Sequence, residues 1–203
     1  MKIHPILLSL ATAAMLATPA AAQDSQDGVY EGTSFTLTPP AKWLLISGSL
    51  TEADRAKLPE NIRDHYRGRN SDIIFMDIDS LDGEAKKGFK NNLNIVSINE
   101  AIPITDDLVK ELSTILEQQY DSMFAQSFKM ESTKTIDLDN IEGKVFYLSG
   151  TYTVQDYSVK LEQILVPGKN ESFVLTCSYE TGKPNTEETA SKCNEAFKSL
   201  KLK

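Results

Sequence analysis

Four segments typical of β-strands follow one another closely in the second half of this chain, and they restrict its fold more than any other feature. The segments span residues 128–138, 144–154, 158–166 and 172–179. Only short turns separate them, including 139–143 and 167–170, which are rich in Asn, Asp, Gly and Pro. Because parallel neighbours need a long crossover and antiparallel neighbours do not, the spacing predicts an antiparallel sheet.

Two further segments show helical periodicity. Residues 105–124 begin at Thr105, a good N-cap, and their apolar stripe runs through Leu108, Leu112, Ile115, Leu116, Gln119 and Met123. Residues 186–200 follow Asn185 and Glu188, which resemble a capping box, and their stripe comprises Ala190, Cys193, Ala196, Phe197 and Leu200. Helices laid on an antiparallel sheet define an α+β fold class.

The first half of the chain predicts four more strands, at residues 34–38, 43–46, 72–78 and 93–98. Residues 49–70 contain few apolar side chains, and we expect them to form a solvated excursion from the sheet. No internal repeat and no change in composition marks a domain boundary. We therefore expect residues 23–203 to form a single domain.

Residues 1–22 have the composition of a secretory signal peptide. Lys2 is followed by an apolar, almost uncharged stretch, and Ala20-Ala21-Ala22 precedes the polar Gln23. An Ala-x-Ala site of this kind predicts cleavage between Ala22 and Gln23, and a periplasmic or secreted protein. The apolar stretch is shorter than the roughly 20 residues that span a bilayer, and no cysteine offers a lipid attachment site. The alternative is an uncleaved interfacial anchor.

The charge of the chain excludes some partners. Lys and Arg number 21 against 29 Asp and Glu, which gives a net charge of −8. An acidic chain repels nucleic acid and anionic lipid surfaces. We therefore expect no nucleic-acid partner and no stable membrane anchor after cleavage.

The two cysteines, Cys177 and Cys193, allow only one intramolecular pairing. Cys177 shares one face of the predicted last strand with Phe173, Leu175 and Tyr179, and Cys193 lies on the apolar stripe of the final helix. An oxidising compartment favours a disulfide between them, and such a loop would contribute about 3 kcal/mol. The alternative is two buried free thiols.

Recognisable catalytic motifs are missing from the sequence, and we expect no catalytic residue, no cofactor and no metal. His65 is the only histidine after the signal peptide, and an exposed helix end explains it. The acidic turns at 77–84 and 137–143 both miss the spacing of a calcium loop. Asn170-Glu171-Ser172 fits a glycosylation sequon, a three-residue match with little specificity.

The order of elements resembles the PsbP-like and DcrB-like superfamily, which shares the fold of the Ran-binding Mog proteins. Residues 35–43, which read FTLTPPAKW, resemble the opening strand of that group, and residues 92–96, NLNIV, resemble its Asn-led strand. The helix at 105–124 before a run of hairpins and the ending FKSL at 197–200 complete the likeness. The resemblance implies an antiparallel sheet between helical layers, and a binding or assembly role without shared catalytic residues.

Three hypotheses about function follow. The first is a periplasmic or secreted binding or accessory protein with an unknown protein or small-molecule partner. The second is an extracytoplasmic hydrolase that uses scattered carboxylates such as Asp72, Asp77 and Glu100. The third is a structural or envelope-stress factor.

Overall fold

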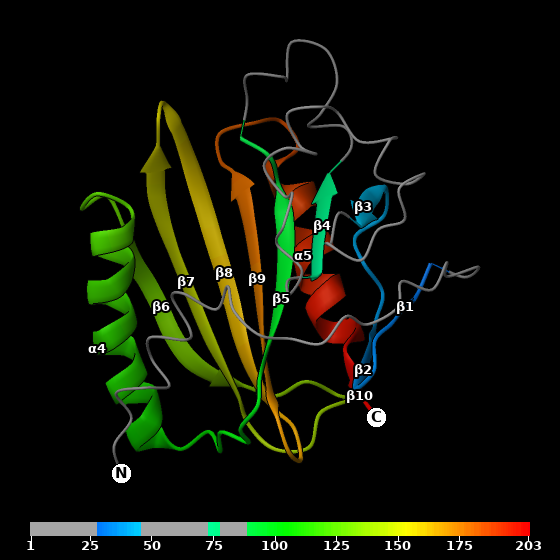
Figure 1. Ribbon diagram of the computed structural model, residues 1–203. Helices are drawn as coiled ribbons and strands as arrows, with labels where there is room; N and C mark the ends of the chain where they lie inside the picture. The colour runs from blue at the N-terminus through cyan, green and yellow to red at the C-terminus, as the bar shows by residue number, and fades with distance from the viewer. Residues whose placement is uncertain (1–27, 46–72, 78–88) are drawn as a thin grey trace.

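The computed structural model describes residues 28–45, 73–77 and 89–203 (Figure 1). In these segments the strands and helices, in chain order, are β1 (Tyr30–Glu31), β2 (Phe35–Leu37), β3 (Trp43–Leu45), β4 (Ile73–Asp77), β5 (Asn92–Ile98), α4 (Asp106–Met123), β6 (Lys129–Ile136), β7 (Val145–Val154), β8 (Tyr157–Pro167), β9 (Ser172–Glu180), α5 (Thr186–Ser199) and β10 (Lys201–Leu202). All eight strands expected from the sequence are present. The short strands β1 and β10 are additional.

A seven-stranded sheet forms the centre of the structure, in the order β3-β4-β5-β9-β8-β7-β6. Every neighbouring pair is antiparallel, as the turn spacing predicted. The middle strand is β9, which joins the earlier strands through β5 to the three hairpin strands through β8. A smaller sheet of order β1-β2-β10 pairs a strand near the start of the chain with one near its end.

Helix α4 covers one face of the large sheet beside β6, β7 and β8 (Figure 1). The Thr105 side chain accepts a hydrogen bond from the Leu108 amide and starts the helix as expected. The buried stripe is Leu108, Leu112, Leu116 and Tyr120, which pack on Leu148, Leu161 and Leu165. Met123, which we expected in this stripe, is 48% exposed. The buried residues are four positions apart, so Tyr120 continues the stripe and faces the sheet, whereas Met123 faces away from it.

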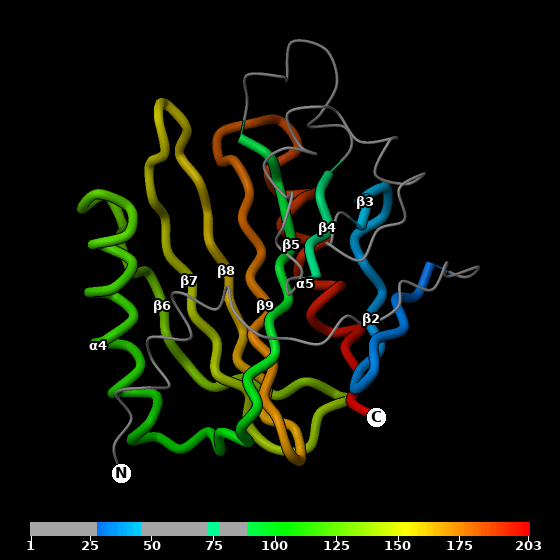
Figure 2. Tube along the Cα trace, viewed as in Figure 1, coloured from blue at the N-terminus to red at the C-terminus, as the bar shows by residue number. Residues whose placement is uncertain are grey.

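Helix α5 covers the opposite face, behind β4 and β5 in Figure 2, and also contacts β9 and β2. Cys193, Ala196, Phe197 and Leu200 of its expected stripe are buried, and Ala190 packs at the edge of the same core. The small sheet covers this core too, since the Phe35 and Phe173 rings lie 5.2 Å apart. No helix in the described part of the chain is long and apolar enough to cross a membrane.

Candidate functional site

The two helices lie on opposite faces and over different halves of the sheet, so each leaves part of its own face to polar side chains. On the α5 face, polar residues occupy β6, β7 and β8. On the α4 face, they occupy β5 and β9.

On the α5 face, the carboxylate of Glu162 lies between two tyrosines and is 6% exposed. Tyr147 Oη donates a hydrogen bond to Glu162 Oε1 at 2.6 Å, and Tyr179 Oη donates to Oε2 at 3.0 Å. The three residues come from β7, β8 and β9, and we call them the Tyr–Glu–Tyr cluster. Strand alternation places them on the same face as Cys177, the register partner of Glu162.

Charged side chains surround the Tyr–Glu–Tyr cluster. Lys160 forms an ion pair with Glu131, which sits at a β-bulge of β6. The Lys134 ammonium lies 5.1 Å from the centroid of the Tyr147 ring, a cation–π contact. Lys134 and Glu131 are exposed, whereas Glu162 is buried beneath them. The surface therefore places exposed charged side chains over the buried, hydrogen-bonded Glu162.

The two tyrosines of this cluster keep their protons throughout the physiological range. Burial raises the pKa of Tyr147 and of Tyr179 well above 10.0, and the hydrogen bond and negative charge of Glu162 raise it further. Both hydroxyls therefore remain donors to the carboxylate. The two neutral hydroxyl groups hydrogen-bond both oxygens of the buried Glu162 carboxylate. Because they keep their protons, neither tyrosine is a strong base or nucleophile.

On the α4 face, a hydrogen-bonded row crosses the middle of the sheet. Tyr120 Oη of α4 donates to Gln163 Oε1 at 3.0 Å, and Gln163 Nε2 donates to Thr176 Oγ1 at 2.7 Å. Asn94 of β5 is the register partner of Thr176 on the other side, and its Nδ2 donates to Asn92 Oδ1 at 2.9 Å. We call Asn92, Asn94, Gln163 and Thr176 the polar row.

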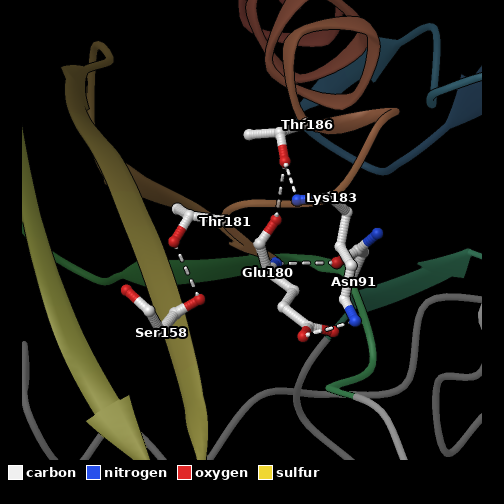
Figure 3. Close-up of polar contacts among 6 residues, drawn as sticks. All are labelled: Asn91, Ser158, Glu180, Thr181, Lys183 and Thr186. Carbon is white, nitrogen blue, oxygen red and sulfur yellow. Dashed lines mark hydrogen bonds and ion pairs between the residues drawn. The ribbon is translucent and has the colours of Figure 1, made fainter.

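The corner between β9 and α5 is fixed by side-chain hydrogen bonds (Figure 3). Asn91 Oδ1 accepts from the Glu180 amide at 3.0 Å, which ties β5 to the end of β9. Thr186 Oγ1 accepts from the Lys183 amide at 3.0 Å and donates to the Glu180 carbonyl. The Asn185 side chain makes no capping bond, so the expected capping box is absent. Thr186 organises this helix start through the preceding turn instead.

The carboxylates named for a hydrolase do not form one site. Asp77 ends β4 and is buried, where it accepts a hydrogen bond from Asn91 Nδ2 at 3.3 Å. Glu100 follows the opposite end of β5, and seven strand residues at about 3.3 Å each separate the two. Asp72 and His65 lie outside the described residues, as do Ala22 and Gln23. No described arrangement joins two of these carboxylates.

The cysteines meet where strand and helix face each other. Cys177 of β9 and Cys193 of α5 form a disulfide with Cα atoms 6.1 Å apart, and both side chains are fully buried. In the acidic turn at 137–143, Asp137 is paired with Lys144 at 2.8 Å. Within the described segments, no group of three His, Cys, Asp or Glu side chains has metal-binding geometry. Most of the turn at 77–84 is outside those segments.

The sequon at 170–172 has a structural explanation for its serine. Ser172 Oγ donates to the Glu100 carbonyl at 2.8 Å and accepts from the Ile102 amide at 2.9 Å. The hydroxyl therefore fastens the segment after β5 to the start of β9. Asn170 itself is exposed in the preceding turn.

Sequence reasoning missed Glu162 and the polar row. Tyr147 and Tyr179 fall within two of the predicted strands, 144–154 and 172–179, but their shared carboxylate was not anticipated. One signal was available. Glu162 and Gln163 interrupt the apolar run of β8, and a polar pair inside a buried strand requires partners.

In the described part of the chain, an antiparallel sheet of this strand order has one helix on each face, which defines a PsbP-like α+β fold. Cyanobacterial PsbP (CyanoP) from Synechocystis matches with a TM-score of 0.52 at 12% identity, over 92% of this chain and 95% of that one. This match confirms the predicted PsbP-like fold and, at such low identity, shows the fold alone. The sequence matches no family model and no curated protein.

Two other solved structures are similar at lower scores. The Ran-binding protein Mog1p of Saccharomyces cerevisiae has a TM-score of 0.49 at 10% identity, over 92% of this chain and 96% of that one. LpqN of Mycobacterium tuberculosis, described as involved in cell envelope biogenesis, has a TM-score of 0.44 at 14% identity, over 91% and 89%.

Proposed function

We propose that this protein is an extracytoplasmic binding or accessory protein without catalytic activity. Residues 1–22 act as its signal peptide, cleaved between Ala22 and Gln23, and residues 23–203 form its single domain. The composition of the first 22 residues supports export, and the disulfide between Cys177 and Cys193 suits an oxidising compartment.

The observation that carries the proposal is the Tyr–Glu–Tyr cluster under exposed charges. A partner protein contacts Lys129, Glu131 and Lys134, which project from the same face of β6 and are exposed. Beneath them, Glu162 and its tyrosines hold a rigid floor. Rigid aromatic and polar floors with charged rims are typical of protein interfaces, in which rim charges steer association.

The chemistry of the cluster supports a binding role over a hydrolytic one. A catalytic carboxylate must reach a substrate proton, and both oxygens of Glu162 already accept tyrosine hydrogens at 2.6 and 3.0 Å. The tyrosines hold their protons through burial and the adjacent negative charge. This arrangement is suited to keeping the binding surface above the Tyr–Glu–Tyr cluster rigid.

The interface is tested by site-specific photo-crosslinking in the source organism. A photo-reactive amino acid replaces Lys134 in one strain and Glu117, an exposed residue of α4, in a matched control strain. We expect one discrete crosslinked species from position 134 and none from position 117. Equal crosslinking at both positions, or turnover of a small substrate by the purified protein, would contradict the proposal.

Export is tested separately by cell fractionation and N-terminal sequencing. We expect the mature protein in the extracytoplasmic fraction, with Gln23 as its first residue. An intact Met1 in the cytoplasmic fraction would contradict the predicted signal peptide.

A further inference from the structure

The polar row lies on the part of the α4 face that helix α4 leaves uncovered. β9 is the middle strand of an antiparallel sheet, and such sheets commonly carry polar side chains where one face meets solvent. The core beneath α4 includes Val174 of β9 and Leu161 of β8 and stops at the row. Thr176 and Asn94 are partly exposed beyond it. Their hydroxyl and amide groups can therefore be reached by a ligand.

The hydrogen bonds of the row have a fixed direction. Burial raises the pKa of Tyr120 to about 12, so its hydroxyl stays a donor to Gln163 Oε1. Gln163 must then present Nε2 to Thr176, whose oxygen accepts. The hydroxyl proton of Thr176 remains available, because no described residue accepts it. The row thus ends in a donor oriented by the protein interior.

Asn94 supplies the complementary groups next to that donor. It uses one Nδ2 hydrogen on Asn92, which leaves its second amide hydrogen and Oδ1 without partners among the described residues. Directly opposed residues in a sheet have Cβ atoms about 5 Å apart. The row therefore offers two donors and one acceptor within a short span, a pattern that matches neighbouring hydroxyl groups of a ligand.

The row carries no net charge. Its side chains are amides and a hydroxyl. At its upper end the charge of Glu180 is balanced, because Glu180 is paired with Lys183 at 3.2 Å (Figure 3) and also interacts with Lys90. A charged ligand would therefore lose its hydration without a compensating ion pair. An uncharged ligand with several hydroxyl groups loses less hydration free energy, and its hydroxyl groups can form hydrogen bonds with the donors and the acceptor of the row.

Aromatic rings border the same face. Tyr152 stacks on Phe124 with centroids 3.8 Å apart and meets the edge of Phe89 at 6.5 Å. Tyr120, the donor to Gln163 of the polar row, lies next to the same rings, with its centroid 6.0 Å from that of Phe124. Phe89 and Phe124 are only partly buried. Apolar walls with a few convergent polar groups are the usual composition of a small-molecule site.

We propose that the polar row and the adjoining rings of Phe89 and Phe124 bind an uncharged saccharide. Thr176 donates to one sugar oxygen, and Asn94 donates to and accepts from neighbouring hydroxyl groups. The C–H face of the sugar packs against the aromatic border. This site is on the face opposite the Tyr–Glu–Tyr cluster, so its test is independent of the partner interface.

The test is a titration of the ¹⁵N-labelled protein, followed by amide chemical shifts. The probes are maltotriose and tri-N-acetylchitotriose, each added up to about 10 mM, with spermidine and citrate as charged controls. We expect a neutral saccharide to shift the amides of residues 92–94, 163 and 176–178. Residues 129–134 on the opposite face should not respond.

Two variants tie binding to the named groups. Thr176→Val preserves side-chain shape in the strand, and Asn94→Leu removes the amide. Each should weaken saccharide binding about tenfold, the usual effect of one lost hydrogen bond. Thr151→Val, a half-buried threonine on the α5 face of β7, is the matched control and should bind as wild type. Spectra unchanged away from the row confirm that each variant is folded.

The proposal is overturned if neither saccharide shifts the row amides at these concentrations. It is also overturned if spermidine or citrate produces the larger response there. Wild-type affinity in both Thr176→Val and Asn94→Leu would likewise remove the row as the site.

Discussion

Reducing the disulfide between Cys177 and Cys193 should lower the free energy of unfolding by an amount that depends on the length of the loop that the disulfide closes. The two residues are 16 apart in sequence and join β9 to α5 in the core of the α5 face. In the chain-entropy model, closing a loop of this length contributes about 3 kcal/mol at 25 °C. For a chain of this size each kcal/mol moves Tm by about 2–4 °C, so reduction should lower Tm by about 6–12 °C.

The assay is thermal unfolding followed by circular dichroism, with and without a phosphine reductant. The double variant Cys177→Ala/Cys193→Ala is the control, since it has no bond to reduce and its Tm should not respond to reductant. Thiol titration of denatured, unreduced wild type should find no free thiol. Two free thiols, or a Tm that is the same with and without reductant, would refute the reasoning.

Three further predictions concern packing and ionisation. Gly150→Ala would place a Cβ 2.4 Å from the Phe128 ring, so we expect a loss of about 1–3 kcal/mol in urea unfolding, and an unchanged midpoint would contradict this. Burial raises the pKa of Tyr120 from 10.0 to about 12 in the folded state, and it also raises the pKa of Tyr147, Tyr152 and Tyr179; the stability that these groups contribute should therefore be constant below pH 10 and be lost as pH rises towards 12, and an unfolding free energy that does not fall between pH 10 and 12 contradicts this. Glu162→Gln should lower the pKa of both tyrosines in the Tyr–Glu–Tyr cluster, because a neutral amide neither repels tyrosinate nor requires a hydroxyl donor; tyrosinate absorbance measures this, and Tyr120, remote from that charge, should titrate as before.

The sequence predicted elements well wherever a local signal was strong. Thr105 and the i, i+4 leucines located α4 to within one residue at each end, and hairpin turns located β7, β8 and β9. The predicted stripe omitted Tyr120, because tyrosine is amphipathic and occurs on the exposed face of a helix as well as on the buried face. β1 and β10 were missed because two residues carry no periodicity.

The candidate sites depend on contacts that no local pattern encodes. Glu162 and Tyr179 are 17 positions apart, and their hydrogen bond follows from the register between β8 and β9. Asn94 and Thr176 are opposed only because the chain returns to place β9 beside β5. One shift of register would move either side chain to the other face, so the sequence alone determines neither site.

The pairing of β2 with β10 and of β5 with β9 has a consequence for the order in which the protein can fold during synthesis. About 80 residues separate β5 from its partner β9, and β2 cannot pair with β10 until Lys201 and Leu202 have been added. Contacts so distant in sequence close slowly. A nascent chain therefore cannot complete either core before β9 and β10 have been synthesised, and this order of folding is compatible with the export proposed above.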